Sequence, residues 1–162
     1  MAPEGSSFVP QGFEPPTQLE TALFVLEPLG PEHNARDHAA WASSIAHIRA
    51  TPGWEGRAED SWPHPMSPAE NLADLEMHAR HFRERVGFTY TVLDPADHDV
   101  LGCVYIYPES RSGSDGEADA VVRSWVRASR AELDAPLWQA VTDWLASDAW
   151  PFALVRYAPR GR

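Results

Sequence analysis

The chain has 162 residues, of which 43% are apolar and seven are Trp, enough for one globular core. Its basic residues are 13 Arg and no Lys, set against 24 acids, and its formal net charge is −11. This charge disfavours nucleic acid and anionic lipid as partners, and the absence of Lys excludes a lysine nucleophile or Schiff base.

Cys103 is the only cysteine, so no internal disulfide and no paired-cysteine zinc site can form. This cysteine usage favours a reducing compartment. The chain opens without a charged leader and apolar run, and no stretch reaches the roughly 18 apolar residues of a membrane span. We therefore expect a cytoplasmic protein with no membrane or nucleic-acid partner.

The first half of the chain predicts a strand and two helices. Residues 1–18 are rich in Pro, Gly and Ser and lack periodicity, which predicts a flexible N-terminal arm before a single domain over 19–162. Residues 19–29 alternate as a strand does. Residues 31–50 form the first predicted helix, because Pro31 suits a helix start and apolar residues follow at helical spacing.

A long loop and a second helix come next. Residues 51–66 hold three Pro, two Gly and two Trp, which no regular element tolerates, and long aromatic loops in compact domains are often functional. Ser67, Pro68 and Glu70 then form the pattern of a capping box with proline at the first helical position. We expect this helix to end at Gly87.

The second half of the chain predicts mainly strands. Residues 88–94 and 100–107 are β-rich runs separated by turn-forming residues, which predicts a hairpin. The second run is apolar on both faces, as in a central strand. After a Gly/Ser-rich loop, residues 118–128 alternate again. A third helix is predicted over about 135–147, with a last strand after it.

The order strand, helix, helix, hairpin, strand, helix, strand resembles the GNAT superfamily of N-acetyltransferases. The local segments "LFVLEPLGPEHNARDHAAW", "FTYTVLDPADHDVLGCVYIYP" and "AVVRSWV" resemble it too, and the likeness covers about residues 20–158. It implies an α/β (α+β) fold with a mostly antiparallel, twisted central sheet flanked by three helices. It also implies transfer of an acetyl or other acyl group from acyl-CoA to the amine of a small molecule. The alternative is a non-catalytic protein of the same fold that binds a small ligand or a protein partner.

The resemblance also implies where acetyl-CoA, or another acyl-CoA, would bind. In that family the fourth strand splays from the fifth and pairs with the pantetheine arm, and the next turn presents backbone amides at a helix N-terminus to the pyrophosphate. The positions of this chain that match are Trp125, Val126, Arg127, Arg130 and Ala135.

The turn departs from the family pattern at one position, and two acids stand beside it. Leu133 stands in place of the first glycine and would crowd a close backbone approach. Glu132 and Asp134 add negative charge where a pyrophosphate would lie, and we expect Asp134 to cap the following helix. Arg123, Arg127 and Arg130 either offset these acids for an anion or simply pair with nearby acids, and both alternatives stay open.

Acyl transfer to an amine needs a base that removes a proton and an acid that protects the leaving thiolate. Glu117 and Asp119 stand where many family members carry the base, although acids after a loop are commonly just solvated. Tyr105 and Tyr157 are the first candidates for the acid, although tyrosines in strands commonly serve packing.

The resemblance implies that the loop between the first two helices forms one wall of the acceptor site. We expect Trp54, Trp62 and His64 to bind an apolar or cationic group there, and the alternative is that both indoles cover the core. The acidic composition favours a cationic amine. The seven histidines show no tight ligand pattern, so no metal site is expected. Either the sheet is smaller than in the family, or the N-terminal arm or a partner subunit covers the edge left by the last strand, and we expect a homodimer.

Overall fold

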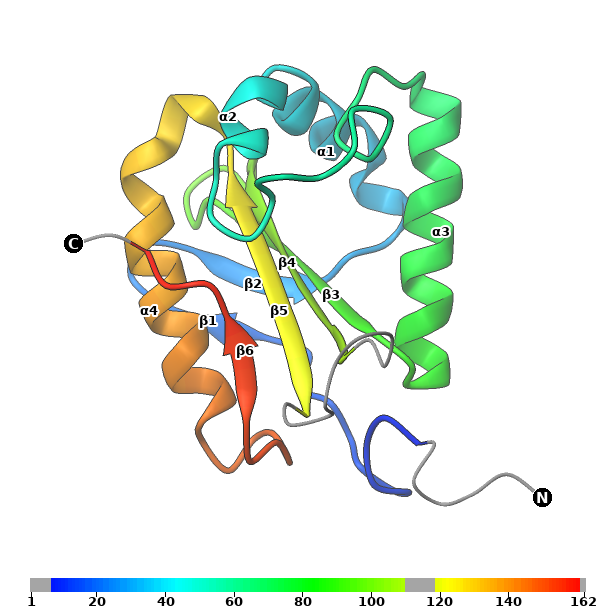
Figure 1. Ribbon diagram of the computed structural model, residues 1–162, viewed down its shortest axis with the longest axis vertical. Coiled ribbons are helices and arrows are strands. Elements are labelled where there is room, and N and C mark those ends of the chain that lie inside the picture. Colours follow the sequence, from blue (N-terminus) through cyan, green and yellow to red (C-terminus); the bar gives the residue numbers. More distant parts are fainter. Residues whose placement is uncertain (1–6, 110–118, 161–162) are drawn as a thin grey trace.

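The computed structural model describes residues 7–109 and 119–160, within which one sheet has the strand order β1-β2-β3-β4-β5-β6 (Figure 1). All neighbouring strands are antiparallel except β5 and β6, which are parallel. The mostly antiparallel sheet flanked by helices that the sequence predicts is therefore confirmed. The strands are β1 (Leu19–Glu20), β2 (Val25–Pro28), β3 (Phe88–Leu93), β4 (Val100–Pro108), β5 (Ala120–Val126) and β6 (Val155–Tyr157).

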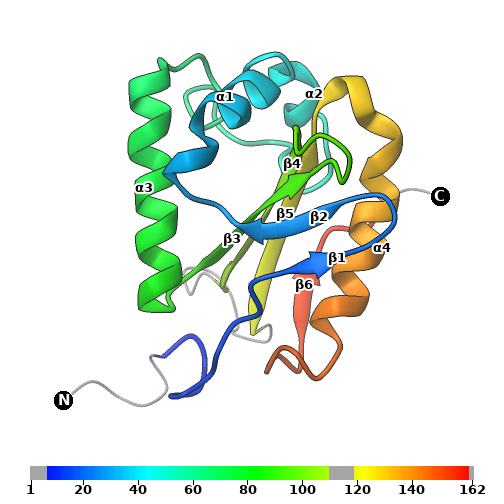
Figure 2. The same cartoon turned by 180° about the vertical axis from the view of Figure 1, so that it is seen from behind.

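Helices cover both faces of this twisted sheet, as the views from front and back show (Figures 1 and 2). α1 and α3 lie over one face and α4 over the other, so two separate clusters of buried side chains form, one on each side. Among the described residues, no helix has both the length and the apolar character needed to cross a membrane. The helices are η2 (Pro31–His33), α1 (Asn34–Ala42), α2 (Ile45–Arg49), α3 (Pro68–Glu84), η3 (Ala128–Leu133) and α4 (Asp134–Leu145).

The single helix predicted over residues 31–50 is wrong, because the structure divides it into η2, α1 and α2. The break between α1 and α2 falls at two serines. The hydroxyl of Ser43 donates to the carbonyl of Ala39 over 3.0 Å, and that of Ser44 donates to the carbonyl of Ala40 over 2.9 Å. Serine hydroxyls that bond back to the preceding turn compete with the helical ladder, which explains the interruption.

α3 begins as the sequence predicts and ends differently. The Ser67 hydroxyl accepts from the Glu70 amide over 3.1 Å and the Glu70 carboxylate accepts from the Ser67 amide over 2.8 Å, so the capping box is confirmed. The left-handed residue after the helix is Arg85, with φ 61°, rather than Gly87. Gly87 has another role, because a Cβ there would overlap the ring of Tyr107.

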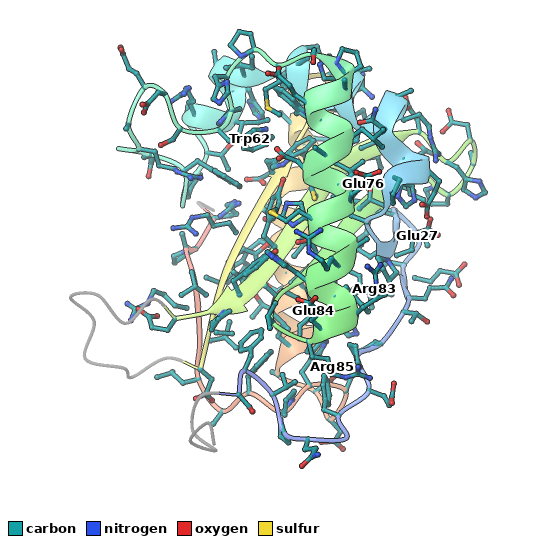
Figure 3. All side chains as sticks on the ribbon, turned by 90° about the vertical axis from the view of Figure 1, so that its right-hand side faces the viewer. Glu27, Trp62, Glu76, Arg83, Glu84 and Arg85 are labelled. Carbon is teal, nitrogen blue, oxygen red and sulfur yellow. The ribbon has the colours of Figure 1, made fainter. Side chains whose placement is uncertain are left out.

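The outer face of α3 is charged, in keeping with an amphipathic helix. Figure 3 shows Glu76, Arg83 and Glu84 on the side of α3 that faces away from the sheet, and all three are exposed. The opposite side carries Asn71 and Leu75, which are buried. This orientation turns one face of α3 toward β4 and the loop that contains Trp62, and it creates the cavity described below.

The segment before β1 lies against the core rather than apart from it. Val9 is 6% exposed and packs in the same cluster as α4. Tyr90 donates from its hydroxyl to the carbonyl of Pro16 over 2.6 Å, and the guanidinium of Arg85 donates to the carbonyl of Phe13 over 2.8 Å. Residues 7–16 thus contribute to the packing of the domain, and residues 1–6 lie outside the described residues.

β5 and β6 pair for three residues and then separate. Ala120, Val121 and Val122 lie opposite the three residues of β6, whereas β5 continues to Val126 and the chain after β6 turns toward α4 (Figure 1). We call the place where residues 123–126 diverge from residues 158–160 the β5–β6 fork. Successive side chains of β5 point to opposite faces of the sheet, as the sequence predicts.

Candidate functional site

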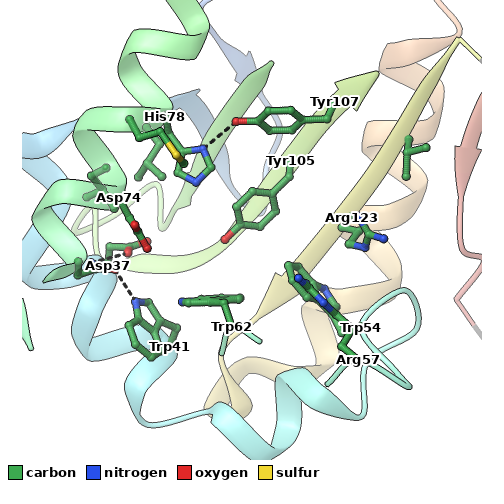
Figure 4. A pocket seen from close by; sticks show the side chains of 15 residues that line it. Asp37, Trp41, Trp54, Arg57, Trp62, Asp74, His78, Tyr105, Tyr107 and Arg123 are labelled. Carbon is green, nitrogen blue, oxygen red and sulfur yellow. Dashed lines mark hydrogen bonds between the residues drawn. The ribbon is translucent and has the colours of Figure 1, made fainter. Parts of the chain in front are cut away.

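A cavity of about 310 Å³ lies between α1, α3, the loop before α3 and the strands β4 and β5 (Figure 4). These five segments, which lie between residues 34 and 126 of the chain, contribute its walls. The side chains that carry its chemistry are Asp37, Trp41, Trp54, Arg57, Trp62, Asp74, His78, Tyr105, Tyr107 and Arg123. Two of the three residues predicted for an acceptor site, Trp54 and Trp62, are among them.

Aromatic rings form much of the cavity wall. The ring of Trp62 lies with its centroid 5.3 Å from that of Trp41, 5.3 Å from that of Trp54 and 6.3 Å from that of Tyr105. Trp54 is 4% exposed and Trp62 is half-buried, so both alternatives for these indoles hold: they cover the core and they face the cavity. Tryptophan faces attract cations as well as apolar groups.

Two carboxylates of the cavity, from α1 and α3, lie on its acidic side. Asp37 is 4% exposed and accepts a hydrogen bond from Nδ2 of Asn71 over 3.0 Å. Burial raises the pKa of Asp37 to about 6, although the Asn71 hydrogen bond lowers it. Burial also raises the pKa of Asp74. At neutral pH the Asp37 carboxylate is therefore mostly ionised with little solvent around it, a suitable surrounding for an ammonium group.

His78 is the neutral polar group of the cavity. Its Nδ1 lies 3.0 Å from the Tyr107 hydroxyl and 3.0 Å from Oγ1 of Thr89. Burial and then the nearby His81 lower the pKa of His78 to about 4, so the imidazole carries no charge at neutral pH. It can accept or donate a hydrogen bond without adding to the charge of the cavity.

Two arginines form the basic side of the cavity. Arg123 donates from Nε to the carbonyl of Gly53 over 2.9 Å, and the guanidinium of Arg57 lies 5.1 Å from the ring centroid of Trp54. Burial, followed by the charge of Arg123, lowers the pKa of Arg57. The two guanidinium groups are thus close enough to repel each other.

The structure separates the two tyrosines predicted as acids. Tyr105 lines the cavity, and its hydroxyl accepts from Nε1 of Trp125 over 2.9 Å and forms a second hydrogen bond with the side chain of Cys103. Burial raises the pKa of Tyr105, so the phenol stays protonated. Tyr157 lies on the α4 side of the sheet, where its hydroxyl shares a hydrogen bond of 2.6 Å with the hydroxyl of Ser124 and burial raises its pKa to about 12.

The other predicted chemical groups do not line the cavity. Oδ2 of Asp119 accepts from the amides of Ala153 and Leu154 over 2.7 and 3.1 Å, which holds the chain at the entrance to β6. His64 donates from Nδ1 to the carbonyl of Pro65 over 3.2 Å, yet it is near enough to Asp74 to lower that residue's pKa. Glu117 lies outside the described residues.

The β5–β6 fork is filled by side chains of the chain itself. The carbonyl of Ser124 accepts from Nε1 of Trp54 over 2.9 Å and from Nη2 of Arg160 over 2.9 Å. Arg160 is 3% exposed, and its Nε donates to Oδ2 of Asp134 over 2.7 Å. Within the described residues, no group of three or more His, Cys, Asp or Glu side chains is arranged to hold a metal ion.

Comparisons with solved structures decide the fold. A ribosomal-protein-S5-alanine acetyltransferase from Vibrio fischeri matches with a TM-score of 0.59 and 14% identity, over 80% of this chain and 67% of that chain. A RimL ribosomal L7/L12 alpha-N-protein acetyltransferase in complex with coenzyme A matches with a TM-score of 0.57 and 13% identity, over 81% and 66%. The GNAT domain of S. lividans PAT matches with a TM-score of 0.54 and 11% identity, over 80% and 73%. This chain has the GNAT fold.

No protein-family model matches the sequence, and no curated protein sequence does either. At 11 to 14% identity, the likeness to these structures concerns the GNAT fold itself. The chain covers about two thirds of the length of the first two of them.

Of the three arginines around the turn of this GNAT fold, Arg127 and Arg130 pair with acids, which is one of the two alternatives that the sequence left open, whereas Arg123 donates to the carbonyl of Gly53. Nη1 of Arg127 lies 3.2 Å from Oδ2 of Asp99. Nε of Arg130 lies 2.9 Å from Oε2 of Glu132, and its Nη1 lies 3.4 Å from Oδ2 of Asp94. The charges of Arg127 and Arg130 are therefore largely compensated within the chain.

The turn itself also differs from the expected anion cradle. Leu133 is buried in the core, and residues 128–133 form η3, so α4 follows without an extended residue before it. The expectation that Asp134 caps α4 is wrong, because a cap needs that extended residue and the Asp134 carboxylate binds Arg160 instead. Trp125 and Val126 are buried in β5, and Ala135 is exposed on α4.

Sequence reasoning missed the acids, the histidine and one arginine of the cavity. A signal was present for two of these groups, since Asp37 stands four residues before Trp41 on one helical face and Asp74 stands four residues before His78 on another. An acid on the apolar face of a helix is uncommon and indicates a partner or a site. No periodic sequence pattern indicated Arg57 as a site residue, because it lies in the irregular loop before α3.

Proposed function

We propose that this protein binds a small amine in the cavity and transfers to it an acyl group from acyl-CoA. The observation that carries the proposal is the position of Trp54. Its ring lines the cavity, and its Nε1 donates to the Ser124 carbonyl in the β5–β6 fork. The Trp54 indole thus connects the cavity to the strand whose backbone, in an acyltransferase of this fold, would bind the acyl donor, and Arg123 of the same strand also lines the cavity. Acceptor and donor must meet at such a place for the transfer to occur.

The cavity supports an amine as the acceptor. An ammonium group gains from the two carboxylates and from the faces of the tryptophans around it. The amine must lose a proton before it attacks a thioester. Asp37 has a pKa of about 6, close enough to neutral for it to take up that proton, and the Tyr105 hydroxyl can donate one.

The likeness to a RimL structure with coenzyme A supports acyl-CoA as the donor. The fork as described does not fit a pantetheine arm, because Trp54 and Arg160 already bind the Ser124 carbonyl. The acids Glu132 and Asp134 also oppose a pyrophosphate at the turn. Binding of acyl-CoA therefore requires residues 158–160 to leave the fork.

An acyl-transfer assay tests this function. The protein is incubated with acetyl-CoA and a panel of amines that includes aromatic amines, diamines and short peptides with a free N-terminus, and the released coenzyme A thiol is measured. Peptides belong in the panel because two of the neighbours are named for ribosomal protein substrates. We expect thiol release with at least one amine and its loss in Asp37→Asn. Equal release with and without every amine would contradict the proposal.

The second candidate is a ligand-binding protein of the GNAT fold without catalytic activity. The buried contacts of Arg160 in the fork favour it, since they occupy the donor site with the chain's own atoms. Melting temperatures separate the two functions, because a ligand that binds only the folded state must raise them. A rise with amines, but none with millimolar acetyl-CoA, would favour the binding protein over the enzyme.

A further inference from the structure

The cavity carries opposite charges on its two sides. Figure 4 shows Asp37 and Asp74 on one side, with Arg57 and Arg123 on the other. The ring of Trp62 and the neighbouring Tyr105 lie between them, so acids and arginines face each other across an aromatic floor rather than in direct contact. Each side therefore presents its charge to whatever occupies the space between them.

Neither side is neutralised by a partner of opposite charge in the described part of the chain. The arginines within 4.0 Å of a carboxylate there are Arg85, Arg127, Arg130, Arg156 and Arg160, and neither arginine of the cavity is among them. Asp37 accepts its hydrogen bonds from a neutral amide. Asp37 is buried and Asp74 half-buried, whereas Arg57 and Arg123 are exposed. Two like charges beside each other raise the energy of the empty site, and a counter-charge lowers it, most strongly on the buried acidic side.

We propose that the ligand of this cavity is bipolar, with an ammonium group bound by Asp37 and Asp74 and a carboxylate bound by Arg57 and Arg123. An apolar spacer between the two groups lies on the rings of Trp62 and Tyr105. This inference rests on the proposed amine site and narrows its substrate class from amines in general to amines that also carry an anionic group.

The residue types on each side fit these two groups. Guanidinium groups bind a carboxylate through parallel hydrogen bonds, and two of them can share one. An ammonium is compact and gains from both carboxylates and the indole faces. A simple diamine would place a cation beside the two arginines, and a dicarboxylate would place an anion beside the two acids, so both are disfavoured by like-charge repulsion.

Three probes of one shape test the inference by calorimetry without acyl-CoA. They are 4-(2-aminoethyl)benzoate, which carries both charges, 2-phenylethylamine, which lacks the carboxylate, and 4-ethylbenzoate, which lacks the amine. A second set, 6-aminohexanoate, hexylamine and hexanoate, varies the spacer. We expect the bipolar member of at least one set to bind about tenfold more tightly than either partner, which corresponds to about 1.4 kcal/mol for the added charged contact.

The outcomes distinguish the two proposals. If the amine binds as tightly as the bipolar probe, the inference is overturned and the amine site stands. If the carboxylate alone binds as tightly, or if no probe of either set gives heat at millimolar concentration, the amine site fails as well.

Variants locate the two groups. Arg123→Gln should abolish the advantage of 4-(2-aminoethyl)benzoate over 2-phenylethylamine and leave the affinity for 2-phenylethylamine unchanged. Asp74→Asn should weaken both. Arg156→Gln, a change at an exposed arginine of β6 outside the cavity, is the matched control and should alter neither. An unchanged advantage in Arg123→Gln and in Arg57→Gln would overturn the assignment of the carboxylate.

Discussion

Nε of Arg160 donates a hydrogen bond of 2.7 Å to Oδ2 of Asp134, at the point where residue 160 passes the start of α4. The same guanidinium reaches the carbonyl and the hydroxyl of Ser124 over 2.9 and 3.1 Å. One buried side chain thus joins β5, α4 and the segment after β6. The charge balance of the β5–β6 fork depends on this pair, because each member is the counter-charge of the other.

Asp134→Asn should destabilise the protein by about 3 kcal/mol, because the substitution leaves a guanidinium that is 3% exposed without a counter-charge. Urea unfolding at neutral pH measures the change. Arg156→Gln serves as the control, since that arginine is 57% exposed, and it should cost less than about 0.5 kcal/mol. Equal effects of the two substitutions would show that the Arg160 pair is as weak as a surface pair.

The double variant Asp134→Ala, Arg160→Ala should bind acetyl-CoA more tightly than the wild-type chain. Removing both side chains frees the Ser124 carbonyl from Arg160 and removes a negative charge at the start of α4. We expect millimolar acetyl-CoA to raise the melting temperature of the variant by several degrees more than that of the wild type. A larger rise for the wild-type chain would show that the pair does not oppose the donor.

Short-range sequence patterns correctly predicted those elements of the fold whose structure depends on contacts between residues close together in the chain. The capping box of Ser67 and Glu70 depends on a spacing of three residues, and the alternation of β5 depends on the period of a strand, so both could be derived from the sequence. The break at Ser43 could not, because serine hydroxyls bond either to solvent or to the preceding turn, and the surroundings decide.

The candidate site depends on contacts between distant segments, and only part of it could be predicted. The resemblance placed Trp54 at the acceptor site, and the chemistry of acyl transfer indicated Tyr105 as a candidate acid; both residues line the cavity. The contact between Asp134 and Arg160 joins residues 26 positions apart, and no pattern around either residue indicates it. Asp134 was therefore predicted as a helix cap, the role that its neighbours alone would suggest.

Gly102→Ala should destabilise the protein by 2 kcal/mol or more, in the range of about 1–3 kcal/mol for overpacking. A Cβ at Gly102 would overlap the carbonyl oxygen of Trp125 on the neighbouring strand, and backbone atoms of a sheet cannot move aside cheaply. Gly30→Ala is the matched control, since its Cβ would meet only the flexible end of Glu32, at 2.6 Å. Thermal unfolding of both variants measures the difference, and a tolerated Gly102→Ala would contradict the close approach of β4 and β5.

Trp62→Leu should weaken amine binding about tenfold and cost little stability, because the Trp62 ring faces the cavity and is only half-buried. Calorimetry with the best amine of the panel measures the affinity. Trp138→Leu, on α4 at the other face of the sheet, is the control and should leave the affinity unchanged. Weakening by both variants to the same extent would indicate a general loss of structure rather than a lost contact.

Asp37→Asn should stabilise the protein, and the gain should grow with pH. Burial raises the pKa of Asp37 from 3.8 to about 6 in the folded state, so the folded protein binds the proton more tightly than the unfolded chain does. At pH values below both pKa values the carboxyl is protonated in both states and costs nothing. As the pH rises from about 4 to about 6, the stability of the wild-type chain falls by about 2–3 kcal/mol through this group, and above pH 6 the cost stays constant.

Urea unfolding of both proteins between pH 4 and pH 7 measures this difference, in which the contribution of His78 cancels because both proteins contain it. Asparagine keeps an oxygen that can accept from Asn71, so the variant retains that hydrogen bond. The same carboxylate should attract the ligand only when it is ionised, so the amine affinity of the wild type should increase from pH 5 to pH 7, and that of Asp37→Asn, in which Asp74 remains, should increase less. A difference in stability that does not change with pH would show that the Asp37 pKa is the same in the folded and unfolded chains. It would also contradict the proposal that the amine site contains a desolvated carboxylate.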